Sequence, residues 1–329
     1  MKKTYLYKAV IFSALTVFFF TTGNSQAENP DGWRHWDGAA YPASVTNNID
    51  THILAETIDT AEIIQTECKR IEGKLASVVP NECQERDLVM NDGVSVNGAS
   101  ILYKEYPPLP NRNPLGRVLL LGGIHGDEYS SVTIVFKWMK TLDQYHSGLF
   151  HWRIVPLLNP DGLLRKKSQR MNANGVDLNR NFPMPDWEAE TTHYWLNRTH
   201  RDPRRYPGKS ALSEPETHWL AKEIEQFEPD VIVAVHAPHG VVDYDGPKDG
   251  PYRLGRLYLS LIGTYPGSLG NYAGVQKNIP VVTIELPYAG IMPKPKEVND
   301  IWRDLVRWLR NHLPTEVRSA ENIQETEPS

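Results

Sequence analysis

Several short apolar runs in this sequence are followed at once by polar residues that could do chemistry. His125 and Glu128 stand three positions apart in the segment GGIHGDE (122–128), directly after one run. His236 follows a second run and Glu285 ends a third. Two histidines and one glutamate are typical ligands of catalytic zinc, which takes three protein ligands and leaves one position open. We therefore expect one zinc ion per chain, held by His125, Glu128 and His236.

The third ligand has an alternative in His239, three positions after His236. We favour His236 because it comes directly at the end of its apolar run. The spacing of His125 and Glu128 is weak by itself, since a histidine and a glutamate three apart recur by chance. The prediction depends on three separate run ends carrying the residue types that a metal requires.

The apolar runs also predict the elements that position these residues. Segments 118–121, 154–158, 231–235 and 281–284 lack polar alternation, which is typical of strands buried on both faces. Apolar residues between and after them recur at helical spacing, which indicates an α/β fold with a parallel or mixed sheet. Ligands bind at the carboxyl ends of strands in such sheets.

Local signals add more elements. Asn91-Asp92-Gly93 predicts a β-hairpin between 88–90 and 94–96. Ser213 with Glu216 three positions later predicts a capping box at a helix start. Helical spacing also predicts a helix within 49–71.

The first residues predict export. Three lysines precede the apolar run 9–20, and Ser25-Gln26-Ala27 fits a cleavage site, so residues 1–27 are expected to be a signal peptide. An uncleaved anchor is the alternative, but a spanning helix needs about 20 apolar residues. Cleavage would leave no membrane anchor and an exported protein, periplasmic or secreted. Loss of the three lysines would change the net charge from −5 to −8, and an acidic chain argues against a nucleic-acid partner.

We divide the rest of the chain into an N-terminal extension (28–85), a catalytic domain (86–314) and a disordered acidic tail (315–329). The two cysteines of the chain, Cys68 and Cys83, both fall in the extension. In an oxidising compartment they could form one disulfide, and two unpaired thiols are the alternative.

Five segments, in order, carry a resemblance to a known family. They are GGIHGDE (122–128), LLNPDG (157–162), RMNANGVDLNRNFP (170–183), VHAP (235–238) and IELP (284–287). The sequence resembles the zinc carboxypeptidase family over about 118–313, and in particular its murein peptide amidase branch. The resemblance implies a three-layer α/β/α doubly wound mixed sheet, one zinc ion, and hydrolysis of an amide next to a free carboxylate.

Roles follow by similarity. The zinc ligands are those already expected, and Glu285 matches the catalytic glutamate that moves protons to and from the attacking water. Arg170 matches the arginine that stabilises the oxyanion. Asn179 and Arg180 match the pair that binds the substrate carboxylate, and Asp177 matches the acid that orients the first zinc histidine. The tyrosine that covers the substrate in many relatives is not placed, with Tyr265 and Tyr272 as candidates.

The resemblance makes a cell-wall peptide the expected substrate, cut between γ-D-glutamate and diaminopimelate. That leaving group presents carboxylate and ammonium groups together, so an acid is expected besides Arg180, and Asp243 and Asp245 are candidates. Two alternatives stay open: an N-acyl amino acid deacylase similar to succinylglutamate desuccinylase, and a wall-binding module without turnover. The NPDG and IELP segments favour the peptidase, and Glu285 with Arg170 argues for an enzyme.

Overall fold

The computed structural model describes residues 60–247 and 249–313, which all belong to one compact unit, Glu56–Ser329. The expected signal peptide, the extension before Thr60 and the acidic tail lie outside the described residues. Within the described part of the chain, no helix is long and apolar enough to cross a membrane.

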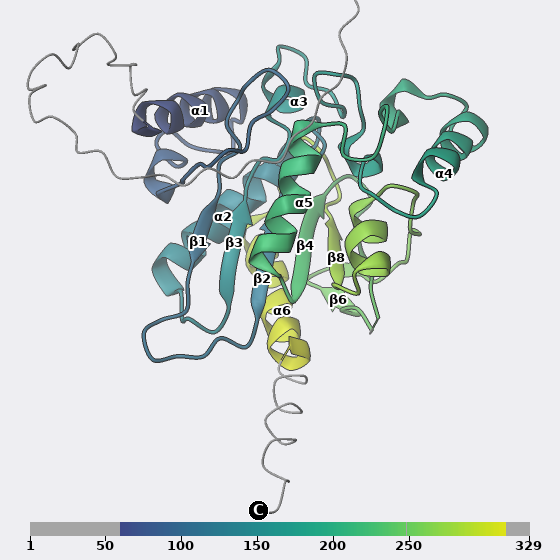
Figure 1. The fold of residues 1–329 in the computed structure, drawn as a ribbon. Helices are drawn as coiled ribbons and strands as arrows, with labels where there is room; N and C mark the ends of the chain where they lie inside the picture. The colour runs from purple at the N-terminus through teal and green to yellow at the C-terminus, as the bar shows by residue number, and fades with distance from the viewer. Residues whose placement is uncertain (1–59, 248, 314–329) are drawn as a thin grey trace, which may run out of the picture. The chain divides into compact units, whose positions relative to one another are not determined.

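A six-stranded mixed sheet forms the centre of the unit, with strand order β1-β3-β2-β4-β8-β5 (Figure 1). The four inner strands run parallel: β3 (His151–Val155), β2 (Arg117–Leu121), β4 (Val231–His236) and β8 (Val281–Glu285). Three of them correspond closely to predicted apolar runs, whereas β3 begins at His151 and shares only Ile154 and Val155 with the predicted run 154–158. The edge strands, β1 (Lys104–Tyr106) and β5 (Val241–Asp245), are antiparallel to their neighbours. The short β6 (Arg253–Leu254) and β7 (Leu257–Tyr258) pair separately.

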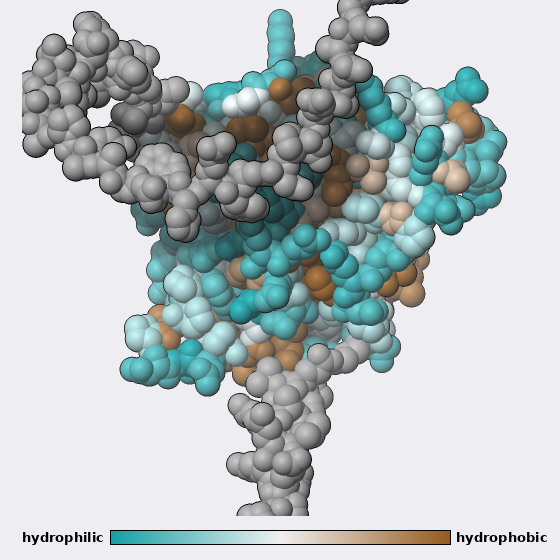
Figure 2. Space-filling view, in the orientation of Figure 1, coloured by the Kyte–Doolittle hydropathy of each residue, from teal (hydrophilic) through white to brown (hydrophobic). Residues whose placement is uncertain are grey.

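Helices lie on both faces of the sheet. They are α1 (Thr60–Lys74), α2 (Tyr129–Tyr145), α3 (Pro160–Leu164), α4 (Trp187–His193), α5 (Pro215–Phe227) and α6 (Pro295–His312), with 3-10 and π-helical turns between them. Leu119 and Leu121 of β2 pack in the core that includes α5, whereas Val118 and Leu120 pack in the core that includes α2 and α6. This alternation gives the three layers that were expected. The face carrying α5 is mostly hydrophilic, with hydrophobic residues in scattered patches (Figure 2).

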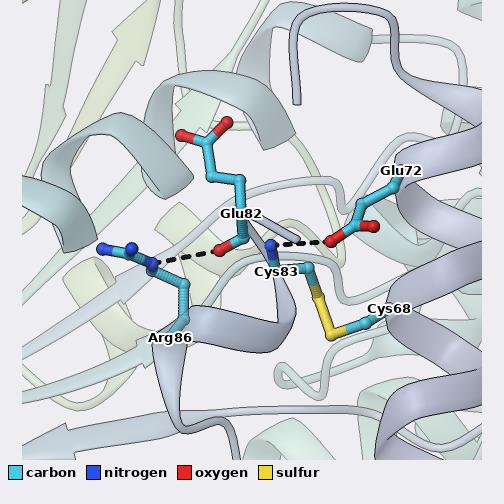
Figure 3. The surroundings of a disulfide bond; sticks show 5 residues. All are labelled: Cys68, Glu72, Glu82, Cys83 and Arg86. Carbon is cyan, nitrogen blue, oxygen red and sulfur yellow. Dashed lines mark hydrogen bonds between the residues drawn. A yellow bond between two sulfur atoms is a disulfide. The ribbon is translucent and has the colours of Figure 1, made fainter. Parts of the chain in front are cut away.

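A disulfide fastens α1 to the segment that follows it (Figure 3). Cys68 in α1 and Cys83 are bonded with their Cα atoms 5.3 Å apart, and both are fully buried. The N–H of Cys83 also donates a hydrogen bond to Glu72 at 3.0 Å. Both cysteines belong to the core that contains α2, so the extension from Thr60 onward packs with the catalytic domain rather than around a core of its own.

The hairpin predicted across Asn91-Asp92-Gly93 is wrong. Isolated bridges instead join Val89 to Tyr103 and Val94 to Ser100. Asn91 Oδ1 accepts hydrogen bonds from Gly93 N and from Trp219 Nε1 on α5. The turn is therefore fixed against a helix, and the residues on its two sides pair with a later segment.

The predicted capping box is also wrong. Helix α5 begins at Pro215, with Glu214 as its N-cap residue and no side-chain cap. Ser213 Oγ donates instead to the Glu214 carboxylate at 2.7 Å. Glu216 lies fully buried and accepts hydrogen bonds from Val96 N at 3.3 Å and Asn172 Nδ2 at 3.1 Å. Its side chain ties α5 to two loops.

Candidate active site

The loop between β2 and α2 carries His125 and Glu128. His125 Nδ1 lies 2.7 Å from Glu128 Oε1, and both side chains are buried. Gly126 makes this approach possible, because a Cβ built there would lie 2.2 Å from the carbonyl carbon of Gly162. Glycine is thus the residue that lets the loop lie directly against the start of α3.

His236 ends β4 and completes a three-residue cluster. Its Nδ1 lies 3.2 Å from His125 Nδ1 and 3.2 Å from Glu128 Oε2. The candidate ligand atoms of these three buried residues all lie within 4.8 Å of one another. Zinc ligands at about 2.0–2.1 Å in a tetrahedral site are about 3.3 Å apart, so the donor types and their spacing fit zinc. His239 is not part of this cluster.

Electrostatics favour the charged form of the cluster's carboxylate. Burial acts to raise the pKa of Glu128, but the adjacent His125 and His236 outweigh it and hold that pKa below its usual range. An ionised carboxylate is the form that a metal requires.

Asp177 lies behind the cluster and is fully buried. Its Oδ1 lies 3.2 Å from His125 Nε2, and its Oδ2 accepts a hydrogen bond from Arg170 Nε at 2.9 Å. Burial opposes the charge on Asp177, but Arg170 and then His125 hold its pKa well below its usual range. Because Nε2 of His125 faces Asp177, Nδ1 is left for the cluster, which is the orienting role expected for this acid.

Arg170 reaches from Asp177 to the cluster. Its Nη1 lies 3.2 Å from His125 Nδ1 and 3.7 Å from Glu128 Oε1. Burial acts to lower the pKa of Arg170, but Asp177 and Glu128 raise it above its usual value. The guanidinium is therefore a fixed positive charge beside the candidate metal ligands.

Asn179 and Arg180 lie together in the 3-10 turn Leu178–Arg180. Asn179 Oδ1 accepts a hydrogen bond from Leu269 N at 2.8 Å, and the Arg180 guanidinium lies 4.5 Å from the ring centre of Tyr265. Arg180 is 4% exposed, and burial lowers its pKa to about 10. Its Nε is buried without a hydrogen-bond partner among the described residues. A guanidinium that lines a cavity is suited to bind a carboxylate.

Glu285 ends β8, directly opposite His236 on the neighbouring strand. It is 6% exposed, and its Oε2 accepts a hydrogen bond from His239 N at 3.4 Å. The sheet register thus places a carboxylate next to the candidate metal ligands. Such a carboxylate can accept and return a proton within the site.

A cavity of about 450 Å³ brings these groups together. The predicted site residues that line it are His125, Glu128, Arg170, Asn179, Arg180, His236 and Glu285. Asp177 is placed behind the wall. Tyr265 lines the cavity, whereas Tyr272 is buried against Phe182. Tyr265 is thus the candidate that faces the site.

Asn159 is a site residue that the sequence reasoning missed. It is fully buried, caps α3 by accepting from Gly162 N, and donates to Ile124 O at 3.3 Å and Arg170 O at 3.1 Å. It therefore ties the His125 loop to Arg170. The signal was present, because asparagine before proline at a helix start is a typical N-cap.

A buried cluster of two histidines and one glutamate, a neighbouring carboxylate and two arginines line one cavity at the carboxyl edge of a mixed α/β sheet. This combination is typical of a metal-dependent hydrolase.

Comparisons with known proteins identify the group. The family described as zinc carboxypeptidase matches residues 91–248. Murein peptide amidase A of Escherichia coli (strain K12) is 31% identical over 223 residues, 66% of this chain and 88% of that protein. Murein peptide amidase A of Vibrio campbellii is 33% identical over 202 residues, 59% of this chain and 77% of that protein. Carboxypeptidase A from Helicoverpa armigera shares the fold, with a TM-score of 0.55 at 16% identity, over 76% of this chain and 81% of that one.

The chain belongs to the zinc carboxypeptidase family and is a hydrolase of the peptidase class. The fold class and the family expected from the sequence are confirmed.

Proposed function

We propose that this protein is an exported zinc peptidase that hydrolyses an amide next to a free carboxylate in cell-wall peptides, such as the bond between γ-D-glutamate and diaminopimelate. The observation that carries the proposal is one cavity shared by the His125–Glu128–His236 cluster, Glu285 and Arg180. Relatives named murein peptide amidase A support the substrate class.

The donor set and the spacing of the cluster fit zinc, and His125, Glu128 and His236 would hold it. Zinc in this position would polarise a substrate carbonyl and make water acidic enough to attack near neutral pH. Every other task falls to side chains of the chain itself.

Glu285 accepts a proton from the attacking water and passes it to the leaving nitrogen. Arg170, held in place by Asp177, stabilises the negative charge that develops on the carbonyl oxygen; one such donor is typically worth about 3–4 kcal/mol of barrier. Asn179 and Arg180 bind the free carboxylate of the leaving residue, which fixes the amide relative to Glu285.

Two features support export. The first 27 residues have the composition of a signal peptide, and the disulfide between Cys68 and Cys83 suits an oxidising compartment. Fractionation of cells with mass spectrometry of the exported chain tests this part. A chain that keeps residues 1–27 or stays in the cytoplasm would refute it.

Hydrolysis is tested with the zinc-loaded chain from residue 28 and three substrates: L-alanyl-γ-D-glutamyl-diaminopimelate, its C-amidated form and an N-succinyl amino acid. We expect diaminopimelate release from the free tripeptide, at least tenfold slower release from the amidated form, and none from the third. Glu285→Gln, with its zinc content measured on the same sample, is the matched inactive control. Cleavage of the N-succinyl amino acid alone would favour a deacylase, and cleavage of no substrate would favour a wall-binding module.

A further inference from the structure

Part of the cavity wall comes from the segment that joins α4 to α5. The residues of this segment that line the cavity are Tyr194, Thr199, Arg204 and Arg205. The ring centre of Tyr194 lies 5.9 Å from Cζ of Arg180. Farther along the segment, Arg204 Nη1 lies 2.9 Å from Asp127 Oδ2, on the loop that carries two candidate metal ligands. The segment therefore runs along the site from Arg180 to the metal-binding loop.

The backbone that carries Arg205 is held firmly. Arg205 ends the 3-10 turn Pro203–Arg205, and its N–H donates to Asp202 O at 2.9 Å. The next residue, Tyr206, accepts a hydrogen bond through its carbonyl oxygen from Asp177 N at 2.8 Å. Arg205 is thus fixed between a capped turn and the buried acid behind the metal cluster.

The guanidinium of Arg205 is engaged much less than its backbone. Among the described residues its one ion pair joins Nη1 to Asp177 Oδ2 at 4.0 Å. That same oxygen already accepts a hydrogen bond from Arg170 Nε at 2.9 Å. Arg204, the neighbouring arginine of the cavity wall, has a close partner in Asp127. Arg205 is therefore the one of the two with donors left for a ligand.

Three guanidiniums lie around the single buried carboxylate of Asp177. Burial lowers the pKa of Arg180, Asp177 opposes this, and the positive charges of Arg170 and Arg205 lower it further. One carboxylate cannot balance three positive charges, so this part of the cavity favours anionic groups of a ligand. In the reaction proposed above, Arg180 meets the carboxylate of the released residue and Arg170 the developing oxyanion. The charge of Arg205 remains without a counterpart.

The position of Arg205 indicates which part of a substrate it would meet. The scissile carbonyl lies at Arg170 and the metal cluster, and the released residue extends from there to Arg180. The acyl part must leave in another direction. The turn that carries Arg204 and Arg205 lies near the metal-binding loop, because Arg204 pairs with Asp127. Arg205 is thus placed beside the acyl residue.

Building on the peptidase function above, we propose that Arg205 is a specificity-determining residue that binds a second carboxylate of the substrate, on the acyl side of the scissile amide. The substrate class is then a peptide whose acyl residue carries a free carboxylate, as a glutamate joined through its γ-carboxyl group does. A guanidinium on a rigid turn is suited to this group, because its donors are arranged as a fork that matches a carboxylate.

Binding of two acyl-side dipeptides tests Arg205 separately from turnover. Calorimetry compares L-alanyl-D-glutamate with L-alanyl-D-isoglutamine, in which an amide replaces the α-carboxylate and the γ-carboxylate is kept. The zinc-loaded protein is expected to bind the first about 10- to 100-fold more tightly, the range of one charge-assisted hydrogen bond. Arg205→Gln should abolish this preference and leave the affinity for the second within about threefold. Arg204→Gln removes the same charge from the same turn, and this matched control should keep the preference.

Equal affinity of the unmodified protein for the two dipeptides would overturn the proposal. Loss of the preference in Arg204→Gln as well would also overturn it, because the summed charge of the cavity and not Arg205 would then be responsible. Circular dichroism and thermal unfolding verify that both variants are folded. If the preference depends on Arg205 but no tripeptide is cleaved, the proposed reaction fails while the assignment of Arg205 stands.

Discussion

The buried glutamate Glu216 makes the stability of this protein depend on pH in a direction opposite to most carboxylates. It is fully buried on α5 and accepts hydrogen bonds from Val96 N and Asn172 Nδ2. Burial raises its pKa to about 7, and the charge of Asp161 adds to the effect. The neutral acid is therefore favoured in the folded protein, whereas the unfolded chain ionises near the ordinary value of 4.5.

The sign and size follow from this difference. Below about pH 4.5 Glu216 is protonated in both states, and its contribution to the unfolding free energy is fully present. Between about pH 4.5 and 7 the unfolded chain binds fewer protons, so the contribution is lost as the pH rises. At about 1.4 kcal/mol per pKa unit, the loss is on the order of 3 kcal/mol.

Glu216→Gln removes this titration at nearly constant shape. Urea unfolding followed by tryptophan fluorescence should be measured at several pH values between 4.5 and 8, with zinc removed from every sample. The difference in unfolding free energy between the unmodified protein and the Glu216→Gln variant should change by about 3 kcal/mol across this range. Glu225→Gln, an exposed position on the same helix, is the matched control and should parallel the unmodified protein. If the unfolding free energy of Glu216→Gln follows that of the unmodified protein across this pH range to within about 0.5 kcal/mol, the reasoning is refuted. A margin of this size allows for the error of extrapolated unfolding free energies.

Three further predictions concern the site and its frame. Asp177→Asn should lower zinc affinity about 10- to 100-fold, measured by chelator competition, because His125 loses its orienting partner; unchanged affinity would contradict that role. The double variant Cys68→Ala, Cys83→Ala should lose about 3 kcal/mol of unfolding free energy in urea, as expected for a loop of about 15 residues, and a loss below about 1 kcal/mol would show that the cross-link adds little. Gly126→Ala should reduce zinc content in elemental analysis, since the added methyl group displaces the His125 loop from α3, and full zinc loading would mean that the loop has room.

The inner strands and the residues at their ends could be predicted because their signals are local. β2, β4 and β8 consist mostly of consecutive apolar residues, and a strand that is buried on both faces shows this pattern without reference to its neighbours. β3 carries His151 and Arg153, so its first residues were not predicted. The edge strands β1 and β5 escaped prediction because both mix polar with apolar residues, and β1 has only three residues. Their strand character comes from pairing with β3 and β8, which no local pattern reveals.

The choice between His236 and His239 could be made from their positions in the sequence, whereas the roles of other site residues could not. Position at the end of an apolar run favoured His236, and the register of β4 with β8 places it opposite Glu285. His239 contributes its backbone N–H to Glu285 rather than a side chain to the cluster. The roles of Asp177 and Arg170 depended on the family resemblance, because their contacts with His125 span 52 and 45 positions of the sequence.

Three buried asparagines explain how loops can hold these side chains firmly. Asn159 ties the His125 loop to Arg170, as described above. Asn172 accepts hydrogen bonds from Asn174 N and Val176 N and donates to Glu214 and Glu216. Asn181 donates to Pro207 O and Ser210 O and accepts from Glu214 N and Thr217 Oγ1.

Each of these asparagines is fully buried, and a buried amide persists only when its donors and acceptors are satisfied. Amide groups do not titrate, so the loops keep their shape as the pH changes. Asn172, however, donates to two carboxylates, Glu214 and Glu216, and burial raises the pKa of Glu216 to about 7. The ionised carboxylate of Glu216 accepts the hydrogen bond from Asn172 more strongly than the neutral acid does. Burial nevertheless disfavours the ionised form, because the folded protein does not replace the water that would solvate its charge. The frame that holds Arg170 and Arg180 is therefore sensitive to pH at Glu216.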